Sequence, residues 1–530
     1  MRHLSRRHFL ATTAALGTLP LIRCAPGAAA TADAVFRHGV ASGDPLTDRV
    51  ILWTRVTTDG TDAVPVRWMV ARDARLTDIV ARGESRTGAA RDFTVKVDVP
   101  GLEAGTHYFY RFEALGVPSA MGRTRTLPGA GAERLRLAVT SCSNLPFGYF
   151  NAYAAIARRP DLDAVLHLGD YIYEYPNAQY GDGTALGRVP APDRETLSLE
   201  DYRTRHAQYK ADPDSQEVHR QHPFICVWDD HELANDAWWG GAQNHNPEDG
   251  EGDWYVRRNA AVQAYYEWMP VREHGSVRHA RLARTFSFGT LADVIMVDSR
   301  LVGRDQQAAS REDIATLDAP HRSMLGRAQE GWLGGEFTES VRAGTGWQIL
   351  GQQTPFAPQS RPGSPAVATD NWDGYRAARD RMFDLVEETG VTNFAVLTGD
   401  VHSVWAYDLP RRPFDDYDPG TGRGSLGVEL ACTSVTSPSS VGAGPDGEGQ
   451  LAAILAARPH LRYVEGRRRG YYILDVTRER LQADHYFVRT IEQRSPDEAF
   501  AKGFVCESGS RRLVETASPA RPAPAPDPAP

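Results

Sequence analysis

Four apolar segments of the sequence each end in a short cluster of polar residues. The clusters read SCSN, GDYIYEY, WDDHELAND and TGDVHS, and they occupy residues 141–144, 169–175, 228–236 and 398–403. Short apolar segments bounded in this way are typical of buried strands. In open α/β sheets, ligands bind beyond the carboxyl ends of the strands. We therefore expect the four clusters to meet at one edge of the fold, although they lie far apart in the sequence.

The first group of candidate ligands contains four chemical types. Cys142 offers a thiolate, Tyr173 a phenolate, His402 an imidazole and Asp170 a carboxylate. Structural zinc sites prefer several sulfur or imidazole ligands, whereas this mixed set suits trivalent iron better. We therefore predict that these four residues bind Fe³⁺.

The remaining candidate ligands supply oxygen. Asp230, Asp400 and Asn235 would form a neighbouring site, with a carbonyl such as that of Gln352 as a further candidate. Hard oxygen ligands of this kind suit Ca²⁺, Mg²⁺ or Mn²⁺. Asp170 could bridge both ions. Two metal ions about 3.5–4 Å apart stabilise in-line attack on phosphorus, so the predicted chemistry is hydrolysis of phosphate esters.

Each cluster taken alone has a simpler explanation. An aspartate after a strand is usually a turn residue or a helix cap, and a buried cysteine is usually part of the core. The core explanation fits Cys226 and Cys432, which lie inside apolar segments, but Cys142 is flanked by Ser141 and Ser143. Two further hypotheses stay open: a thiol hydrolase with Cys142 as the nucleophile, and a non-catalytic exported binding protein that metal ions only stabilise.

The composition limits the classes of protein to consider. The chain has 530 residues, of which 41% are hydrophobic and 24% are charged, as in soluble globular proteins. This length favours two domains. The formal net charge is −9 and no long basic segment occurs, so no nucleic-acid-binding surface is indicated.

Residues 35–127 read as a series of short strands. Segments such as RVILWTRV and VPVRWMVA are apolar or alternating, and Gly, Pro and Asp separate them. This pattern predicts a small β-sandwich domain. The sequence GLEAGTHYFYRF is similar to the fibronectin type III pattern, with Tyr108 at the tyrosine corner. A hydrogen bond between its hydroxyl group and the backbone is expected there.

Residues 134–495 are predicted to form the catalytic domain. LRLAVTS and LDAVLHLGD read as strands on either side of a helix in YFNAYAAIARRP, which indicates a βαβ-like unit. Further strands and helices follow, among them ADVIMVDSR and VTNFAVLTGDVH. We therefore predict a large layered α/β domain.

The two ends of the chain are predicted to lie outside these domains. Residues 1–32 combine an arginine pair at positions 6 and 7, an apolar stretch and small residues, which is typical of a twin-arginine signal peptide. The signal predicts passage through the Tat translocase to a periplasmic or extracellular location, without a transmembrane anchor. Residues 512–530 are rich in Pro and Ala and are predicted to be a disordered tail. A disulfide between two of the following cysteines remains an alternative: Cys226, Cys432 and Cys506.

The motifs SCSN, GDYIYEY, WDDHE and TGDVHS resemble those of the PhoD-like alkaline phosphatases, a branch of the calcineurin-like metallophosphoesterase superfamily. VASGDPLTDRVILWTRV and GRTRTLP are similar to the N-terminal domain of the same family. The resemblance implies an α/β fold, a four-layer α/β/β/α metallophosphoesterase sandwich preceded by a small fibronectin-III-like β-sandwich domain. It also implies hydrolysis of phosphate mono- or diesters with iron and calcium.

The resemblance assigns roles to single residues. Asp170 corresponds to the metal-bridging aspartate and Tyr173 to the iron-bound phenolate, while Cys142 stands where the wider superfamily has an aspartate. Asp230 and Asp400 replace an asparagine and a histidine of the superfamily motifs. These exchanges move the second metal site towards oxygen ligands, which favours calcium over zinc.

The implied mechanism is attack on phosphorus by a metal-bound hydroxide, in line with the leaving oxygen. His231 matches the histidine that donates a hydrogen bond to the phosphoryl oxygen or protonates the leaving alcohol. Arginines near the site could hold the phosphate by bidentate hydrogen bonds. The candidates are Arg257, Arg258 and Arg300, and a solvent-facing salt bridge is the alternative for each.

Overall fold

The structure of the protein, a computed structural model, describes residues 31–530. The predicted signal peptide, residues 1–32, lies outside the described residues except for its last two positions. Within residues 31–530, none of the helices has both the length and the apolar character needed to cross a membrane.

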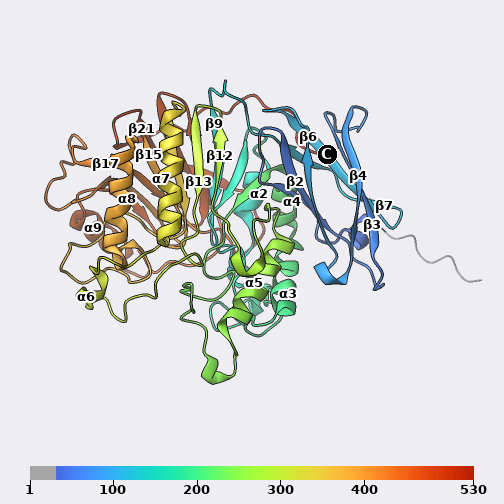
Figure 1. Ribbon diagram of the computed structural model, residues 1–530, viewed down its shortest axis with the longest axis horizontal. Coiled ribbons are helices and arrows are strands. Elements are labelled where there is room, and N and C mark those ends of the chain that lie inside the picture. The colour runs from blue at the N-terminus through green and yellow to red at the C-terminus, as the bar shows by residue number, and fades with distance from the viewer. Residues whose placement is uncertain (1–30) are drawn as a thin grey trace, which may run out of the picture.

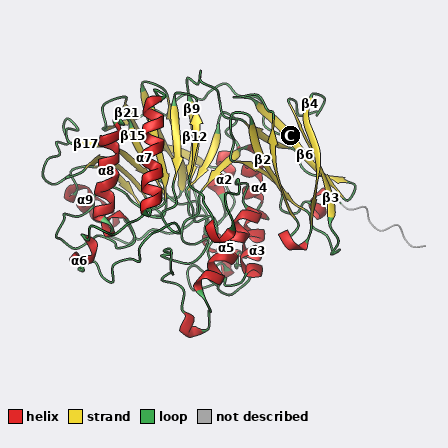
Figure 2. Ribbon diagram, viewed as in Figure 1, coloured by secondary structure: helices red, strands yellow, loops and turns green. Residues whose placement is uncertain are grey.

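The strands of the described residues form three sheets (Figures 1 and 2). In spatial order, the ten-stranded sheet contains β22 (Leu513–Thr516), β21 (Glu498–Glu507), β20 (Arg480–Val488), β19 (Gly470–Val476), β9 (Leu135–Thr140), β10 (Ala164–His167), β11 (Pro223–Cys226), β1 (Val40–Gly43), β2 (Arg49–Arg55) and β5 (Thr94–Pro100). The seven-stranded sheet contains β12 (Arg284–Phe288), β13 (Ala292–Met296), β14 (Trp347–Gln352), β15 (Phe394–Thr398), β17 (Ser425–Ala431), β16 (Val404–Pro410) and β18 (Leu461–Glu465).

The third sheet is smaller and N-terminal. It contains β4 (Ile79–Thr87), β3 (Val64–Ala71), β6 (His107–Ala114) and β7 (Val117–Pro118), and β8 (Gly122–Arg125) pairs with β6. The α-helices of the described residues are α1 (Ala32–Val35), α2 (Asn151–Ala157), α3 (Leu199–Lys210), α4 (Pro213–Gln221), α5 (Trp254–Trp268), α6 (Ile314–Leu317), α7 (Arg327–Arg342), α8 (Arg376–Thr389) and α9 (Gly447–Ala457).

The two large sheets pack face to face because their central strands are apolar on both sides. Successive side chains of a strand point to opposite faces. In β13, Val294 and Met296 lie in the core between the two sheets together with Leu137 of β9, whereas Ile295 packs on the helix side with Phe383 of α8. Helices α7 and α8 cover the outer face of the seven-stranded sheet (Figure 1), and α2 and α4 lie on the ten-stranded sheet. This confirms the predicted four-layer α/β/β/α fold.

The N-terminal strands form the predicted β-sandwich. Strands β2 and β5 face β3 and β6 across a core that includes Val50, Val66 and Tyr110. The backbone N–H of Glu103 donates a hydrogen bond of 2.8 Å to the hydroxyl oxygen of Tyr108, which is the bond expected at a tyrosine corner.

One sheet of this sandwich is continuous with the catalytic domain, which the sequence did not indicate. Strand β1 pairs in parallel with β11, with Ser42 opposite Pro223. The edge of β11 would otherwise expose unpaired backbone groups, and proteins usually cover such edges. The predicted boundary at residue 127 therefore separates two segments of the chain but does not separate two sheets.

A buried ion pair fixes this junction and leads to a first prediction. Asp44, which follows β1, accepts a hydrogen bond of 2.7 Å from the guanidinium of Arg284 in β12. We expect Asp44→Asn to lower the free energy of unfolding by about 3–5 kcal/mol, because the buried guanidinium loses its charged partner. Urea denaturation monitored by circular dichroism measures the change. Asp48→Asn is the control, since its pair with Arg49 is exposed and should contribute little; equal effects would contradict the prediction.

The C-terminal segment, predicted as a disordered tail at residues 512–530, is instead bound along the protein. After β22 it runs to the N-terminal strands, where the C-terminus lies near β6 (Figure 1). The backbone N–H groups of Ala520, Ala523 and Ala529 donate hydrogen bonds of 2.8–2.9 Å to side chains of the body. The intervening prolines keep the segment extended, so it loses little conformational entropy on docking. The amino-acid composition of the segment does not reveal these hydrogen-bond acceptors, because other parts of the chain supply them.

The cysteines of the described residues form no disulfide. Cys142, Cys226, Cys432 and Cys506 are all free and buried. None of the three disulfides that the sequence left open is present.

Candidate metal centre

The carboxyl ends of six parallel strands point to one region of the molecule. Strands β9, β10 and β11 are parallel neighbours in the ten-stranded sheet, and β13, β14 and β15 are parallel neighbours in the seven-stranded sheet. The chain segments that follow these strands carry the predicted site residues: Cys142 after β9, Asp170 and Tyr173 after β10, Asp230 and His231 after β11, and Asp400 and His402 after β15.

The four residues predicted to bind iron are adjacent. One ligand atom each of Cys142, Asp170 and His402 lie within 4.8 Å of one another. The hydroxyl group of Tyr173 donates a hydrogen bond of 3.0 Å to Asp170 Oδ2 and lies 3.2 Å from His402 Nε2. Three separate chain segments therefore bring a thiol, a carboxyl, an imidazole and a phenol group close together.

Carboxylates form the second part of the site. Three overlapping sets have ligand atoms within 4.8 Å of one another: Asp170, Asp230 and His231; Asp229, Asp230 and Asp400; Asp230, Asp236 and Asp370. Asp229, Asp236 and Asp370 were not predicted from the sequence. Asp229 and Asp236 lie inside the motif WDDHELAND, which could have indicated them, whereas Asp370 lies in the long loop after β14, far along the chain from the strand end at Gln352.

Asn235, predicted as a ligand of the second cation, lies next to Asp236 of the carboxylate cluster. Its carboxamide nitrogen donates a hydrogen bond of 2.9 Å to Gln243, which leaves the carboxamide oxygen as the atom that would bind a cation, and its assignment stays a prediction. The side chain of Gln352 is engaged at both ends, because its amide nitrogen donates a hydrogen bond of 2.7 Å to Thr398 and its oxygen accepts one of 3.0 Å from Trp372.

Arg300, which follows β13, reaches the carboxylates. Its fully buried guanidinium donates hydrogen bonds to Asp229, to Asp370 at 2.8 Å and to Asp400 at 3.3 Å. Arg300 therefore holds three carboxylates from different segments close together.

The other two arginines considered from the sequence do not join the cluster. Arg257 forms ion pairs with Glu195 at 2.7 Å and with Glu251 at 3.2 Å. Arg258 donates no hydrogen bond to any residue from 31 to 530 and lines a separate cavity. Of the three candidates, Arg300 is the one that the fold brings to the site.

Two buried glutamates position the strand-end segments, and neither was predicted as a site residue from the sequence. Glu232 accepts hydrogen bonds from the backbone N–H groups of Asp170 at 3.1 Å and Asp229 at 2.7 Å, so it joins the segments after β10 and β11. Glu174 accepts a hydrogen bond of 2.8 Å from His231 Nδ1, which leaves Nε2 of this histidine directed towards the carboxylates. Such outer partners orient the groups that contact a metal or substrate.

Several site residues have a strained backbone. Cys142, Asp170, Asp236, Asp400 and His402 have φ values between 53° and 63°, a region that non-glycine residues rarely adopt. Strain of this kind persists where the surrounding structure enforces it, and it is concentrated at functional sites. The turns bring side chains of adjacent strands to a common centre.

The carboxylates repel one another in a buried environment. Burial raises the pKa of Asp229 well above its ordinary value, with Asp230 adding to the effect and Arg300 opposing it. Burial, together with Asp370, raises the pKa of Asp236 to about 7. For Asp230, burial is outweighed by Arg300 and His231, which hold its pKa at about 2. The cluster therefore contains more negative charge than Arg300 can balance, and bound cations would lower this electrostatic cost.

The hydrogen bonds of the cluster test whether metal ions fit it. Asp170 Oδ1, Asp229 Oδ2 and Asp230 Oδ1 are buried, and none of them has a hydrogen-bond partner among residues 31–530. Buried carboxylate oxygens are almost always satisfied by a hydrogen bond or by a metal ion. The chemistry of the donors therefore fits cations: a mixed sulfur, oxygen and nitrogen set beside Cys142, and oxygen alone around Asp230.

Cys142 has the environment of a ligand rather than of a nucleophile. Burial raises the pKa of its thiol well above the ordinary value, and the carboxylate of Asp170 raises it further. A nucleophilic thiol needs a lowered pKa or an adjacent base. The ring of His402 is engaged elsewhere, because Nδ1 lies 2.8 Å from the carbonyl oxygen of Pro438 and Nε2 contacts Tyr173. The geometry does not support a thiol hydrolase.

A cavity gives access to the cluster. It has a volume of about 640 Å³ and is lined by Asp400 and His402 on one side and by apolar residues such as Val441 and Ile454 on another. A cavity of this size can accept a small organic substrate. The site can therefore hold an ester beside the candidate metal ligands.

The sequence matches the family described as "PhoD-like phosphatase" over residues 137–485 and the family described as "PhoD-like phosphatase, N-terminal domain" over residues 23–128. Alkaline phosphatase D of Bacillus subtilis (strain 168) is 37% identical over 468 residues, which cover 85% of this chain and 77% of that protein. A solved structure of PhoD is similar with a TM-score of 0.83 and 34% identity, and the match covers 94% of each chain. With the fold and the site geometry in agreement, the chain belongs to the PhoD-like phosphatase family and is a phosphoesterase.

Proposed function

We propose that the protein is an exported, metal-dependent phosphoesterase that hydrolyses phosphate mono- and/or diesters with Fe³⁺ and Ca²⁺, the second site also accepting Mg²⁺ or Mn²⁺. The observation that carries the metal dependence is the group of buried carboxylate oxygens without partners around a common centre. Cys142, Asp170, Tyr173 and His402 would hold the iron. Asp170 would be shared with the second cation.

The carboxylates after β11 and β15 would hold the second cation, together with Asp370. When bound, the cations would stabilise the charge on the phosphoryl oxygens and acidify a water molecule. Arg300 would keep the carboxylates in position, because each of its nitrogen atoms already contacts one of them. This arrangement prepares a site for charge that develops during ester hydrolysis.

His231 is the proposed proton donor. Burial tends to lower its pKa, but the carboxylates of Glu174 and Asp230 raise it well above the ordinary value, which favours the protonated imidazole. Its Nδ1 is bound to Glu174, and Nε2 is the atom that can donate to a phosphoryl oxygen or to the leaving alcohol. The ring of Tyr173 stacks on His231 with centroids 4.3 Å apart and limits its rotation.

Export through the Tat translocase to the periplasm or the cell exterior is part of the proposal and is supported by the arginine pair and apolar stretch of residues 1–32. The alternative of a non-catalytic binding protein that metal ions only stabilise is less consistent with the site. A purely structural metal site would not need a protonated His231 held by Glu174 next to the carboxylates.

Metal removal tests the proposed function. We expect the purified protein to contain iron and calcium by elemental analysis, and we expect EDTA treatment to lower hydrolysis of 4-nitrophenyl phosphate and bis(4-nitrophenyl) phosphate by about 10³-fold. The reason is that metal ions contribute several kcal/mol of transition-state stabilisation. The melting temperature should also fall, because the carboxylates then repel one another. Calcium and iron added back together should restore both properties; a metal-free protein with full activity would overturn the proposal.

A further inference from the structure

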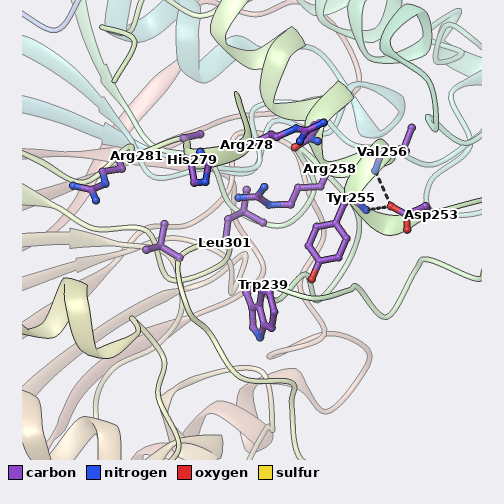
Figure 3. Close-up of a pocket in the computed structure, with 12 residues that line it drawn as sticks. Trp239, Asp253, Tyr255, Val256, Arg258, Arg278, His279, Arg281 and Leu301 are labelled. Carbon is purple, nitrogen blue, oxygen red and sulfur yellow. Dashed lines mark hydrogen bonds between the residues drawn. The ribbon is translucent and has the colours of Figure 1, made fainter. Parts of the chain in front are cut away.

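A second cavity, of about 660 Å³, lies beside the start of α5 and outside the metal centre. We call it the arginine cavity and define it by Arg258, Arg278 and Arg281 together with the aromatic residues Trp239 and Tyr255. Figure 3 shows these side chains around the cavity, with Tyr255 beside Trp239 and Arg258 extending from α5. None of these residues belongs to a candidate metal cluster.

The arginine cavity is positively charged in a protein of negative net charge. The chain has a formal net charge of −9, but this cavity is lined by three arginines and by one acidic residue, Asp253. The carboxylate of Asp253 already accepts hydrogen bonds from the backbone N–H groups of Tyr255 at 2.8 Å and Val256 at 3.2 Å, at the N-terminus of α5. It therefore does not form an ion pair with the arginines, and the cavity favours anions.

Arg258 is buried without a partner. The residue is only 8% exposed, and its Nε atom has no hydrogen-bond partner among residues 31–530. Burial lowers the pKa of Arg258, and Asp298 opposes this effect without forming an ion pair with it. The adjacent Arg257, in contrast, is paired with Glu195. The terminal nitrogens of Arg258 form no ion pair within residues 31–530, and the residue lines the cavity. Because the positive charge is only partly solvated and has no acidic partner, the structure offers this group to an anion that enters the cavity.

Exposed aromatic rings form another wall of the cavity. The side chain of Trp239 is 50% exposed and that of Tyr255 is 42% exposed, although large apolar groups are usually covered. Their ring centroids are 6.2 Å apart. Such rings provide a surface on which a flat group can stack.

We propose that the arginine cavity binds an organic phosphate that carries a flat ring, such as a nucleoside monophosphate, at a site separate from the metal centre. The guanidinium group of Arg258 binds the phosphate by charge-assisted hydrogen bonds. Arg278 and Arg281, which lie apart from each other along the cavity (Figure 3), add positive charge around it. The ring stacks on the exposed face of Trp239, and Tyr255, whose ring is inclined to that of Trp239 by 50°, borders it. The volume is sufficient for one ligand of this size, and binding here does not depend on the metal chemistry of the proposed function.

Calorimetric titration with a non-hydrolysable nucleoside 5′-phosphonate tests the proposal. We expect two molecules to bind per chain of the metal-loaded protein, one at the metal centre and one in the arginine cavity. In Arg258→Gln the second event should weaken by about tenfold or more, because a charge-assisted hydrogen bond is lost. Trp239→Ala should weaken it by about tenfold through loss of stacking. Turnover of 4-nitrophenyl phosphate should stay unchanged in both variants.

Controls separate this result from misfolding and from unspecific charge effects. Arg86→Gln changes an arginine outside both cavities and should leave both binding events intact. If Arg258→Gln does not fold, the double variant Arg278→Gln/Arg281→Gln changes two exposed residues and should weaken the same event. Adenosine without phosphate and inorganic phosphate alone should each bind more weakly than the phosphonate. The proposal would be overturned if every observed binding event were unaffected by Arg258→Gln, by Trp239→Ala and by the double variant. A single event that these variants weaken would support the arginine cavity and contradict binding at the metal centre instead.

Discussion

Asp170→Asn is expected to remove bound metal and to lower the rate of phosphate-ester hydrolysis by about 10³–10⁴-fold. Asp170 belongs to the set with Cys142 and His402 and also to the set with Asp230 and His231. Its Oδ2 accepts a hydrogen bond from the hydroxyl group of Tyr173, and its Oδ1 is buried and has no hydrogen-bond partner among residues 31–530. Asparagine keeps the size of the side chain but removes the negative charge that both cations would share. A loss of about 4–5 kcal/mol of metal-dependent stabilisation corresponds to this factor.

Metal content per chain, measured by elemental analysis, and kcat with 4-nitrophenyl phosphate test this prediction together. Asp408→Asn is the matched control, because Asp408 is also a buried aspartate and accepts a hydrogen bond of 2.9 Å from Arg462, outside the metal centre. The control should lose stability and keep its metal. An Asp170→Asn protein with full metal content and full turnover would exclude the assigned role.

His231→Gln is expected to lower kcat by about 10²–10⁴-fold while bound metal is retained. This range is typical for the loss of a general acid. The effect should be larger for alkyl phosphates than for 4-nitrophenyl phosphate, since a poor leaving group needs the proton more. Metal retention distinguishes a proton donor from a ligand, because His231 also lies within 4.8 Å of Asp170 and Asp230.

Glu174→Gln tests how His231 is positioned. Glutamine can still contact His231 Nδ1, but it no longer raises the pKa of the imidazole by its charge. We expect a smaller loss, of about 10–100-fold, as for other partners of functional groups. Steady-state kcat values for a series of phosphate esters that differ in their leaving group compare both variants with the unmodified protein. Equal losses with alkyl and aryl substrates in His231→Gln would contradict proton donation to the leaving oxygen and leave hydrogen bonding to the phosphoryl oxygen as the role.

Much of the site was predictable because its signals are local. A short apolar run followed by polar residues indicates a buried strand and its carboxyl end, and parallel strands bring such ends together. Cys142, Asp170, Tyr173 and His402 could therefore be grouped from the sequence. The layered fold followed from the same alternation of strands and helices, and the family resemblance gave its number of layers.

The residues that could not be predicted are those that the arrangement of a whole segment or a distant contact brings to the site. Asp229 and Asp236 join the carboxylates from the same segment as Asp230, and the motif by itself does not show which of its acidic residues approach the centre. Asp370 comes from a loop without a strand-end signal, and Arg300 draws it to the site through an ion pair of 2.8 Å. The binding of the C-terminal segment likewise depends on acceptors on the surface of other elements.

The amino-acid sequence by itself determined which chemical groups this protein can bring to a phosphate ester, because strand ends and their polar residues are encoded within a few neighbouring positions. Tertiary structure alone decided the pairing of β1 with β11, the approach of Asp236 and Asp370 to the other carboxylates and the arginine cavity around Arg258. These features arise from contacts between residues far apart in the chain, and the free energy of each contact depends on the burial that only the complete fold provides.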